Sequence, residues 1–190
     1  MQKILSALAL LLFFVLLGGR AAMLRKKGIR AIVFAQTDKS DLLLLPVFLA
    51  LAYTILACAF ALPMPRWLIR PFWASPAPGW LGLLLAAMAL AGFALTLRSF
   101  GDSFRVGIDE KTPDKLVITG MFAVSRNPIY VCFLMFFLGQ FLVNPNAALA
   151  IVIPLLALAI HRQILREEAF LAPHYGAEYA AYRRRVRRYL

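Results

Sequence analysis

Long apolar segments separated by short polar ones dominate the chain. Three apolar runs fill its first half, at residues 4–19, 42–62 and 79–97. A run of about 20 apolar residues can cross the hydrocarbon core of a bilayer as a helix. The first run follows Lys3 and has the look of a secretory signal, but Arg20 stands where signal cleavage requires small residues. We therefore predict three spanning helices, the first of which is uncleaved and continues through Leu24.

Two shorter apolar runs follow in the second half, at residues 129–143 and 147–160. Asn144-Pro145-Asn146 separates them and is a strong turn signal. Each run covers only about 22 Å as a helix, less than the roughly 30 Å hydrocarbon core. The pattern predicts a tight helical hairpin whose helices continue beyond their apolar parts, with the fifth helix reaching about Phe170 and ending at Pro173.

A polar, arginine-rich segment closes the chain and predicts a last helix over about residues 177–189. The expected fold is all-α: a polytopic membrane protein with five transmembrane helices and a cytoplasmic C-terminal helix. We expect one membrane domain over residues 1–190. In it, residues 1–97 form three N-terminal helices, and residues 98–190 form a cytoplasmic loop, the hairpin and the last helix.

Composition supports a membrane protein. Of the 190 residues, 62% are hydrophobic and 16% charged, whereas soluble domains average about 25% charged residues. A soluble fold of this length could not bury so much apolar surface. Continuous runs rich in leucine and alanine favour helices over a barrel, whose strands would alternate.

The net charge of +12 is distributed unevenly. With the N-terminus outside, all Lys and Arg except Lys3, Arg66 and Arg70 fall on the inner side, as do all nine acidic residues. This is the bias of the positive-inside rule. We therefore expect the active side to be cytoplasmic, in a bacterial inner membrane by composition. The basic residues are expected to contact lipid, not nucleic acid; no oligomeric state is predicted.

Polar groups that can carry chemistry gather on this predicted inner side. Arg126-Asn127-Pro128 has two interpretations. Asn127 can cap a helix whose first position is Pro128, or Arg126 and the free N–H groups of the helix start can bind an anion. Glu167-Glu168 is either a solvated helix face or a pair of carboxylates that binds a ribose or an ammonium group.

Aromatic residues mark the last part of the chain. Tyr175, Tyr179 and Tyr182 fall at helical spacing on one face. This segment is either an amphipathic interfacial helix or an aromatic cover for a bound planar group. Cys58 and Cys132 lie in apolar runs without metal-like spacing, so we expect no metal site.

These elements, taken in order, form a pattern. The pattern comprises Gly120-Met121-Phe122, Ser125-Arg126-Asn127-Pro128-Ile129-Tyr130, the turn at Asn144-Pro145, Glu167-Glu168, Tyr175-Gly176-x-x-Tyr179-x-x-Tyr182 and Val186. It resembles the isoprenylcysteine carboxyl methyltransferase and phospholipid methyltransferase superfamily of integral membrane enzymes. The resemblance covers about residues 116–186.

The resemblance implies methyl transfer from S-adenosylmethionine to a lipidic or membrane-partitioned carboxylate, amine or thiol at the cytoplasmic membrane face. It implies catalytic roles for Arg126 and Glu168. The cofactor-binding residues that it implies are Gly120, Arg126, Asn127, Pro128, Tyr130, Glu167, Glu168, His174, Tyr175, Gly176, Tyr179 and Tyr182.

The acceptor and two other functions stay open. Many carboxyl-methylating relatives have histidine where Asn127 stands, and asparagine resembles the phospholipid-methylating branch. One alternative is an NADPH-dependent membrane reductase, since sterol reductases share a related C-terminal half. The other is a non-catalytic, transporter-like protein, but transporters usually place ionisable residues inside their spans, and these apolar runs contain none.

Overall fold

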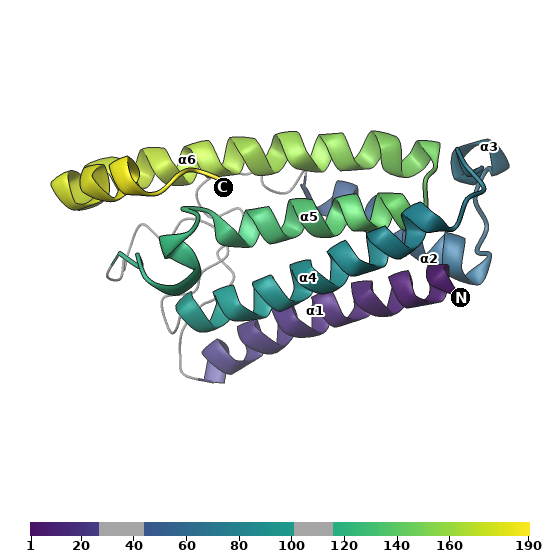
Figure 1. Cartoon of the computed structure of the whole chain (residues 1–190), viewed down its shortest axis with the longest axis horizontal. Helices are drawn as coiled ribbons and strands as arrows, with labels where there is room; N and C mark the ends of the chain where they lie inside the picture. Colours follow the sequence, from purple (N-terminus) through teal and green to yellow (C-terminus); the bar gives the residue numbers. More distant parts are fainter. Residues whose placement is uncertain (27–43, 101–115) are drawn as a thin grey trace.

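The computed structural model describes residues 1–26, 44–100 and 116–190, drawn as ribbons in Figure 1. These ranges form six α-helices and one 3-10 turn, which confirms the all-α fold. The elements are α1 (Gln2–Lys26), α2 (Leu44–Phe60), α3 (Arg66–Ile69), α4 (Ala77–Phe100), η3 (Gly120–Ala123), α5 (Pro128–Val143) and α6 (Ala147–Arg185). The longer helices lie side by side, with α5 between α4 and α6 and with α1 beside α4 (Figure 1).

Three of the described helices, α1, α4 and α6, are long and apolar enough to cross a membrane. The other two predicted spans are shorter: α2 has 17 residues and α5 has 16. The predicted run to Leu62 was too long at its C-terminal end, because α2 stops at Phe60. Ala61 has a φ of 54°, a left-handed conformation that ends a helix. Leu42 and Leu43 lie outside the described residues.

The predicted turn between the last two long helices is present. α5 ends at Val143, and Asn146 caps α6 by accepting a hydrogen bond from the Leu149 N–H at 3.0 Å. The hairpin is less tight than expected, because α5 packs most extensively on α4 and less on α6.

Small residues allow α4 and α5 to approach closely. A Cβ added to Gly82 would lie 2.5 Å from the Gly139 carbonyl oxygen, and one added to Gly139 would lie 2.6 Å from the Gly82 carbonyl oxygen. Such mutual contact of backbones is a common way for membrane helices to associate. The pair therefore fixes how α5, whose first turn carries the candidate site, sits on α4.

An aromatic cluster holds the centre of the bundle. The ring of Phe13 on α1 lies 5.5 Å from Phe93 on α4 and 5.0 Å from Phe136 on α5, and it is stacked on both. Phe48 on α2 meets Phe137 on α5 edge-on at 5.8 Å. Aromatic pairs of this kind add specific geometry to apolar burial, so the cluster ties four helices together.

A buried polar contact joins α1 to α5. The Ser6 hydroxyl donates to the Gln140 side-chain oxygen at 2.5 Å, and the Asn144 amide donates to the Ser6 hydroxyl at 3.0 Å. All three side chains are buried. Hydrogen bonds between membrane helices fix their relative position, so this contact fixes the axial position of α1 relative to α5.

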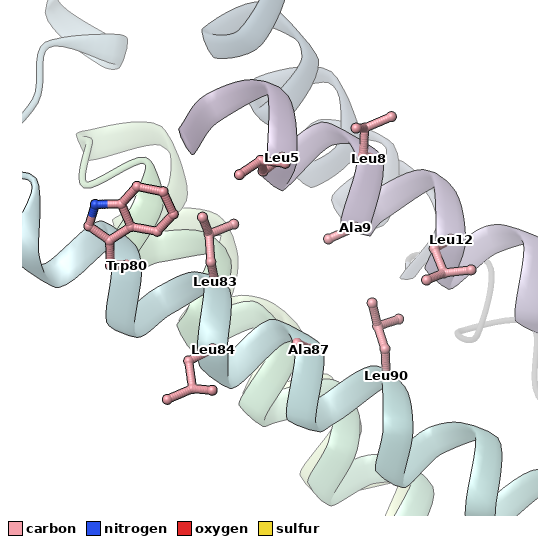
Figure 2. Close-up of a pocket in the computed structure, with 9 residues that line it drawn as sticks. All are labelled: Leu5, Leu8, Ala9, Leu12, Trp80, Leu83, Leu84, Ala87 and Leu90. Carbon is pink, nitrogen blue, oxygen red and sulfur yellow. The ribbon is translucent and has the colours of Figure 1, made fainter. Parts of the chain in front are cut away.

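An apolar groove of about 510 Å³ runs between α1 and α4 (Figure 2). Leucines such as Leu5 and Leu12 line it from α1, and Trp80 and Leu90 line it from α4. Among the described residues that line it, only Trp80 has a polar side-chain group, its indole N–H. The groove therefore cannot supply the charged groups that the sequence predicts for a cofactor site.

The last part of α6 differs from the prediction. The helix continues through Pro173, where we expected it to end, and its break comes at Gly176, with φ 48° and ψ −119°. Beyond that kink the chain turns back beside α6 (yellow in Figure 1). The final helical segment ends at Arg185 and not near Tyr189, since Val186 is extended. Proline removes only one N–H and can stay inside a kinked helix, whereas the Gly176 conformation is open to glycine alone.

Candidate active site

The first turn of α5 begins as predicted, with Pro128 at the first helical position and Asn127 at the N-cap position. The Asn127 side chain, however, makes no capping hydrogen bond. Its amide donates to a Glu168 carboxylate oxygen at 3.3 Å and to the Arg188 carbonyl at 3.1 Å. The capping interpretation of this side chain is therefore wrong, because Asn127 links α5 to α6 and to the C-terminal tail.

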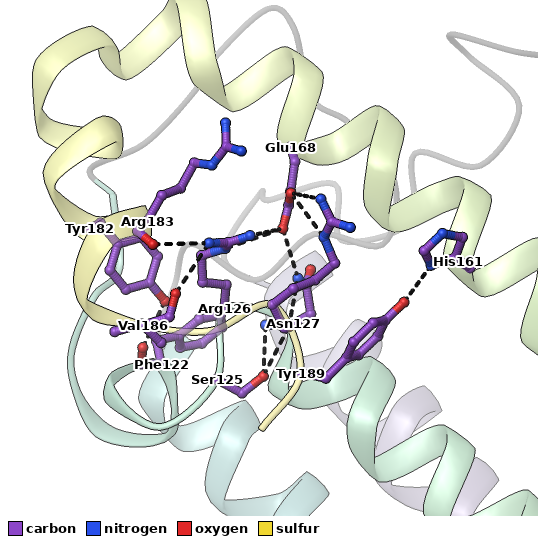
Figure 3. Close-up of polar contacts among 11 residues, drawn as sticks. Phe122, Ser125, Arg126, Asn127, His161, Glu168, Tyr182, Arg183, Val186 and Tyr189 are labelled. Atoms are coloured by element: carbon purple, nitrogen blue, oxygen red, sulfur yellow. Dashed lines mark hydrogen bonds and ion pairs between the residues drawn. The ribbon is translucent and has the colours of Figure 1, made fainter.

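Glu168 lies at the centre of the site and is only 6% exposed. Arg126 donates to its Oε1 at 2.8 Å, and Arg188 donates to its Oε2 at 2.9 Å (Figure 3). A second N–H of each guanidinium, Nε, lies 3.2 Å from the same oxygen. We call Arg126, Asn127, Glu168 and Arg188 the Glu168 cluster. A buried carboxylate is tolerated only when its charge and lone pairs are matched in this way.

The C-terminal tail, residues 186–190, passes over this cluster (Figure 3). The Arg126 backbone N–H donates to the Arg187 carbonyl at 2.9 Å. The Arg126 guanidinium also donates through Nη1 to the carbonyls of Arg183 and Val186, at 3.3 and 3.2 Å. Arg126 therefore fixes both the final helical segment and the tail by their backbone.

Two further contacts fasten the tail. The Ser125 hydroxyl donates to the Arg188 carbonyl at 3.3 Å and accepts from the Asn127 N–H at 3.1 Å. The Tyr189 hydroxyl lies 2.6 Å from Nδ1 of His161 on α6, and the two rings are stacked (Figure 3). The tail thus spans from the start of α5 to α6.

The other predicted glutamate, Glu167, forms a neighbouring contact between the same helices. The Tyr130 hydroxyl of α5 donates to its Oε1 at 2.5 Å, and Gln163 donates to the same oxygen at 3.0 Å. Both glutamates therefore contact the start of α5, Glu168 at Asn127 and Glu167 at Tyr130. These contacts argue against a purely solvated helix face.

The aromatic residues separate into two groups at the Gly176 kink. Tyr179 and Tyr182 are buried, and the Tyr182 hydroxyl donates to the Phe122 carbonyl at 2.7 Å. Tyr175 is half-buried and His174 is exposed at the tip of α6, where His174 stacks on Phe170 at 5.7 Å. The predicted single face is therefore wrong, because the kink falls between Tyr175 and Tyr179.

The Tyr179 hydroxyl is buried without a hydrogen-bond partner in the described part of the chain. Arg183 lies over its ring, 5.9 Å from the centroid. Burial, followed by the Glu168 charge, raises the pKa of Tyr179 to about 12. The phenol is therefore a protonated donor, and a buried donor without a partner costs about 1–3 kcal/mol. A ligand atom at this point would remove that cost.

Charge balance keeps Glu168 ionised. Burial alone would raise the pKa of the Glu168 carboxyl, but hydrogen bonds from Arg188 and Arg126 and their charges outweigh it and hold that pKa below its usual value. Glu168 lies beyond the apolar part of α6, so these groups meet where the helix leaves the apolar region.

The sequence profile described as phospholipid methyltransferase matches residues 78–178, more than half of the chain. The chain belongs to the phospholipid methyltransferase family. A search of curated proteins finds no match. Members of the family are integral membrane enzymes that transfer a methyl group from S-adenosylmethionine to a lipid acceptor.

The family match confirms the resemblance seen in the sequence and favours methyl transfer over the reductase and transporter alternatives. It begins in α4 and ends at Glu178, just past the Gly176 kink. Tyr179, Tyr182 and Arg188 of this methyltransferase therefore lie outside it, and the structure alone brings them to the residues inside.

Gly120 stands apart from the Glu168 cluster. It opens η3 with a φ of 62°, and a Cβ there would lie 2.4 Å from the Ser99 hydroxyl of α4. The same hydroxyl accepts from the Met121 N–H at 3.2 Å. Gly120 thus seats η3 on α4, and η3 holds Tyr182 through the Phe122 carbonyl.

The candidate site includes residues for which the sequence predicted no role, chiefly Arg188 and the pair of His161 and Tyr189. Ser125 belonged to the motif pattern but was not assigned a contact. Arg188 is one of five arginines near the chain end, and nothing in the sequence distinguishes it. His161 directly follows the apolar run of α6, and this position alone does not indicate a contact with the tail. These residues join the site because the tail folds back toward α5 and α6, and the sequence does not reveal that fold.

The residues present fit the cofactor of the family. S-adenosylmethionine offers a carboxylate, an ammonium, ribose hydroxyls and an adenine ring. Around the Glu168 cluster the chain offers the Arg188 guanidinium, whose side chain is 33% exposed, the Glu167 carboxylate, the unpaired Tyr179 hydroxyl and the rings of His174 and Tyr175. Each group of the cofactor thus has a complementary partner type near α6.

Proposed function

We propose that this chain methylates a lipid acceptor with S-adenosylmethionine bound beside the Glu168 cluster, on the cytoplasmic side of the membrane. The observation that carries the proposal is the buried Glu168 carboxylate, ion-paired with Arg126 from the start of α5 and Arg188 from the tail. Three segments far apart in sequence converge there, inside and just beyond the region that matches the family.

In this proposal Arg126 and Glu168 are positioning residues. Both Glu168 oxygens bind guanidinium groups, and the Arg126 side chain is only 9% exposed. Their task is to hold the tail and the final helical segment against α5. Holding these groups in place before the cofactor arrives reduces the entropy lost on binding.

Other residues of the chain would contact the cofactor. The more exposed Arg188 and the first backbone N–H groups of α5 suit its carboxylate. Glu167 suits the ammonium or ribose, and the Tyr179 hydroxyl suits a ribose oxygen. His174 and Tyr175 at the tip of α6 suit the adenine ring.

Little chemistry is then required of the protein. The cofactor supplies a methyl group whose bond to sulfur breaks as a lone pair of the acceptor forms the new bond, and S-adenosylhomocysteine leaves. The chain aligns the two groups and excludes water. A carboxylate or thiolate acceptor needs no base, whereas an ammonium must first lose a proton.

A transfer assay tests the proposal. The purified protein, reconstituted with phosphatidylethanolamine, receives radiolabelled S-adenosylmethionine, and extracted lipids are separated to identify the labelled species. We expect labelled lipid from wild type, and at least about 100-fold less from Glu168→Gln, since removing one partner of a buried pair costs about 3–5 kcal/mol.

Glu178→Gln is the matched control, because Glu178 is exposed on the same segment and lies outside the cluster. It should label lipid as wild type does. Equal labelling by folded Glu168→Gln would remove the cluster from the mechanism. No labelled lipid from folded wild type would argue against this acceptor class.

A further inference from the structure

Three arginines near the chain end take no part in the Glu168 cluster. Arg184, Arg185 and Arg187 are exposed, and within the described residues none of them has a carboxylate in ion-pair distance. Their neighbours differ: Arg188 binds Glu168, and Arg183 lies over the Tyr179 ring. Exposed like charges so close together repel one another unless an anion is present.

The fold places this group next to the membrane edge. The Arg187 carbonyl accepts a hydrogen bond from the Arg126 N–H, two residues before the apolar helix α5 begins. Two residues later Tyr189 reaches His161, the first residue after the apolar run of α6. Leu190 beyond it is 72% exposed. The chain therefore leaves the membrane along α6, turns at Gly176 and returns to the level where the apolar helices end.

We propose that Arg184, Arg185 and Arg187 form a docking surface for the anionic headgroups of membrane lipids. Clusters of basic residues just outside a membrane helix are attracted by the negative surface potential of a leaflet, which decays within about 10 Å. Arginine also matches phosphate oxygens in two-point hydrogen bonds. A bilayer is always within reach of this segment, which favours lipid over nucleic acid as the partner.

Docking would act on the enzyme through the tail backbone. The carbonyls of Val186, Arg187 and Arg188 accept hydrogen bonds from the start of α5. A lipid that holds the tail against the membrane therefore stabilises the Glu168 cluster. By linkage, anionic lipid and cofactor then raise each other's affinity. This coupling rests on the proposed function, whereas the docking itself does not.

The full-length protein in lipid nanodiscs tests both parts. One set of discs contains phosphatidylcholine alone, and another contains about one third phosphatidylglycerol. Hydrogen exchange of the peptide that covers residues 186–190 reports on the tail, and titration with S-adenosylhomocysteine reports on the site. With the anionic lipid we expect tail exchange at least about fivefold slower and cofactor-product affinity raised by a similar factor.

Charge variants locate the effect. The triple variant R184Q/R185Q/R187Q should behave in phosphatidylcholine as wild type does, but should lose the response to phosphatidylglycerol. The control K3Q/R66Q/R70Q removes three exposed positive charges elsewhere and should keep the response.

Specific results would overturn the proposal. These are a full response in the triple variant, no response in wild type, or the same tail protection from inorganic phosphate in phosphatidylcholine discs. Equal protection by a short oligonucleotide would point to nucleic acid instead. Protection of the tail in a protein that never binds S-adenosylhomocysteine would support docking while refuting the proposed function.

Discussion

A single buried carboxylate organises the polar end of this protein. Glu168 receives hydrogen bonds from Arg126, Asn127 and Arg188, which come from α5 and from the tail. Taking these charges out of water is costly, so the arrangement is stable only while all partners are present. Loss of Glu168 would leave two guanidinium groups facing each other and remove the ion pair that holds the Arg188 side chain of the tail.

Tyr179 and Tyr182 provide a test at the level of single residues, because only one of the two hydroxyls has a hydrogen-bond partner in the described chain. The Tyr179 hydroxyl is buried without a partner in the described chain, and the Tyr182 hydroxyl donates to the Phe122 carbonyl. Tyr179→Phe should leave stability unchanged or raise it by up to about 1 kcal/mol, while weakening S-adenosylhomocysteine binding about 3- to 10-fold.

Tyr182→Phe is the control and should lower stability by about 1 kcal/mol, because it leaves a buried carbonyl without its donor. Thermal unfolding in detergent and calorimetric titration measure the two effects. Full cofactor-product affinity in Tyr179→Phe would show that this hydroxyl does not meet the ligand.

The sequence predicted part of this site and could not predict the rest. Arg126, Asn127 and Glu168 belong to an ordered motif set, and the structure brings them within hydrogen-bond distance. Arg188 could not be identified among the five arginines near the chain end, because all five have the same charge and lie close together in the sequence. Asparagine is a common N-cap residue, so the sequence predicts that Asn127 caps α5. The structure shows why it does not: its side chain donates to the Glu168 carboxylate and the Arg188 carbonyl instead.

At the scale of elements, the Gly176 kink decides where the tail goes. Without it, α6 would continue away from the membrane, and Tyr179 and Arg188 could not reach Glu168. Apart from its chain neighbours and the backbone of its own helix, no atom of the described residues lies within 4 Å of a Cβ placed on Gly176. Its requirement for glycine is therefore one of backbone conformation and not of space.

Gly176→Ala consequently should destabilise the kink by about 1–2 kcal/mol or more, since its positive φ is strained for any side chain. We expect weaker S-adenosylhomocysteine binding and faster hydrogen exchange of the tail. Gly18→Ala is the control. Gly18 lies inside α1 with equally open space, so alanine there should be neutral or stabilising by about 0.5–1 kcal/mol. Equal behaviour of the two variants would contradict the role of the kink.

The apolar runs predicted where the helices lie more accurately than they predicted where the helices end. The length of an apolar run predicts a helix well, because a bilayer requires every backbone group to be paired internally. Ends depend on local backbone conformation, which composition does not reveal. Ala61 takes a left-handed conformation despite its helical preference, and Pro173 stays inside α6.

For the whole molecule, the distribution of basic residues agrees with one orientation. α1 carries Arg25 and Lys26 in its last turn, and α4 carries Arg98 in its last turn. Figure 1 shows both of these ends on the side where α5 begins and the tail returns. Basic residues near helix ends favour the cytoplasmic side, so the Glu168 cluster should face the cytoplasm.

Reporter fusions test this orientation in a bacterial host. A fluorescent protein fused after Leu190 should fluoresce, because it folds in the cytoplasm, whereas alkaline phosphatase at the same point should be inactive. Fusions at the N-terminus should give the reverse. A C-terminal fusion active only as phosphatase would place the site outside and would contradict the assignment.

The central claim is that the Glu168 cluster builds the binding site for S-adenosylmethionine, and calorimetric titration with S-adenosylhomocysteine tests it most directly. We predict saturable binding near one per chain in wild type and in Glu178→Gln, and an affinity lower by about 100-fold or more in Glu168→Gln. Thermal unfolding of each variant shows that it is folded. Wild-type affinity in folded Glu168→Gln, or no binding by folded wild type, would contradict the account.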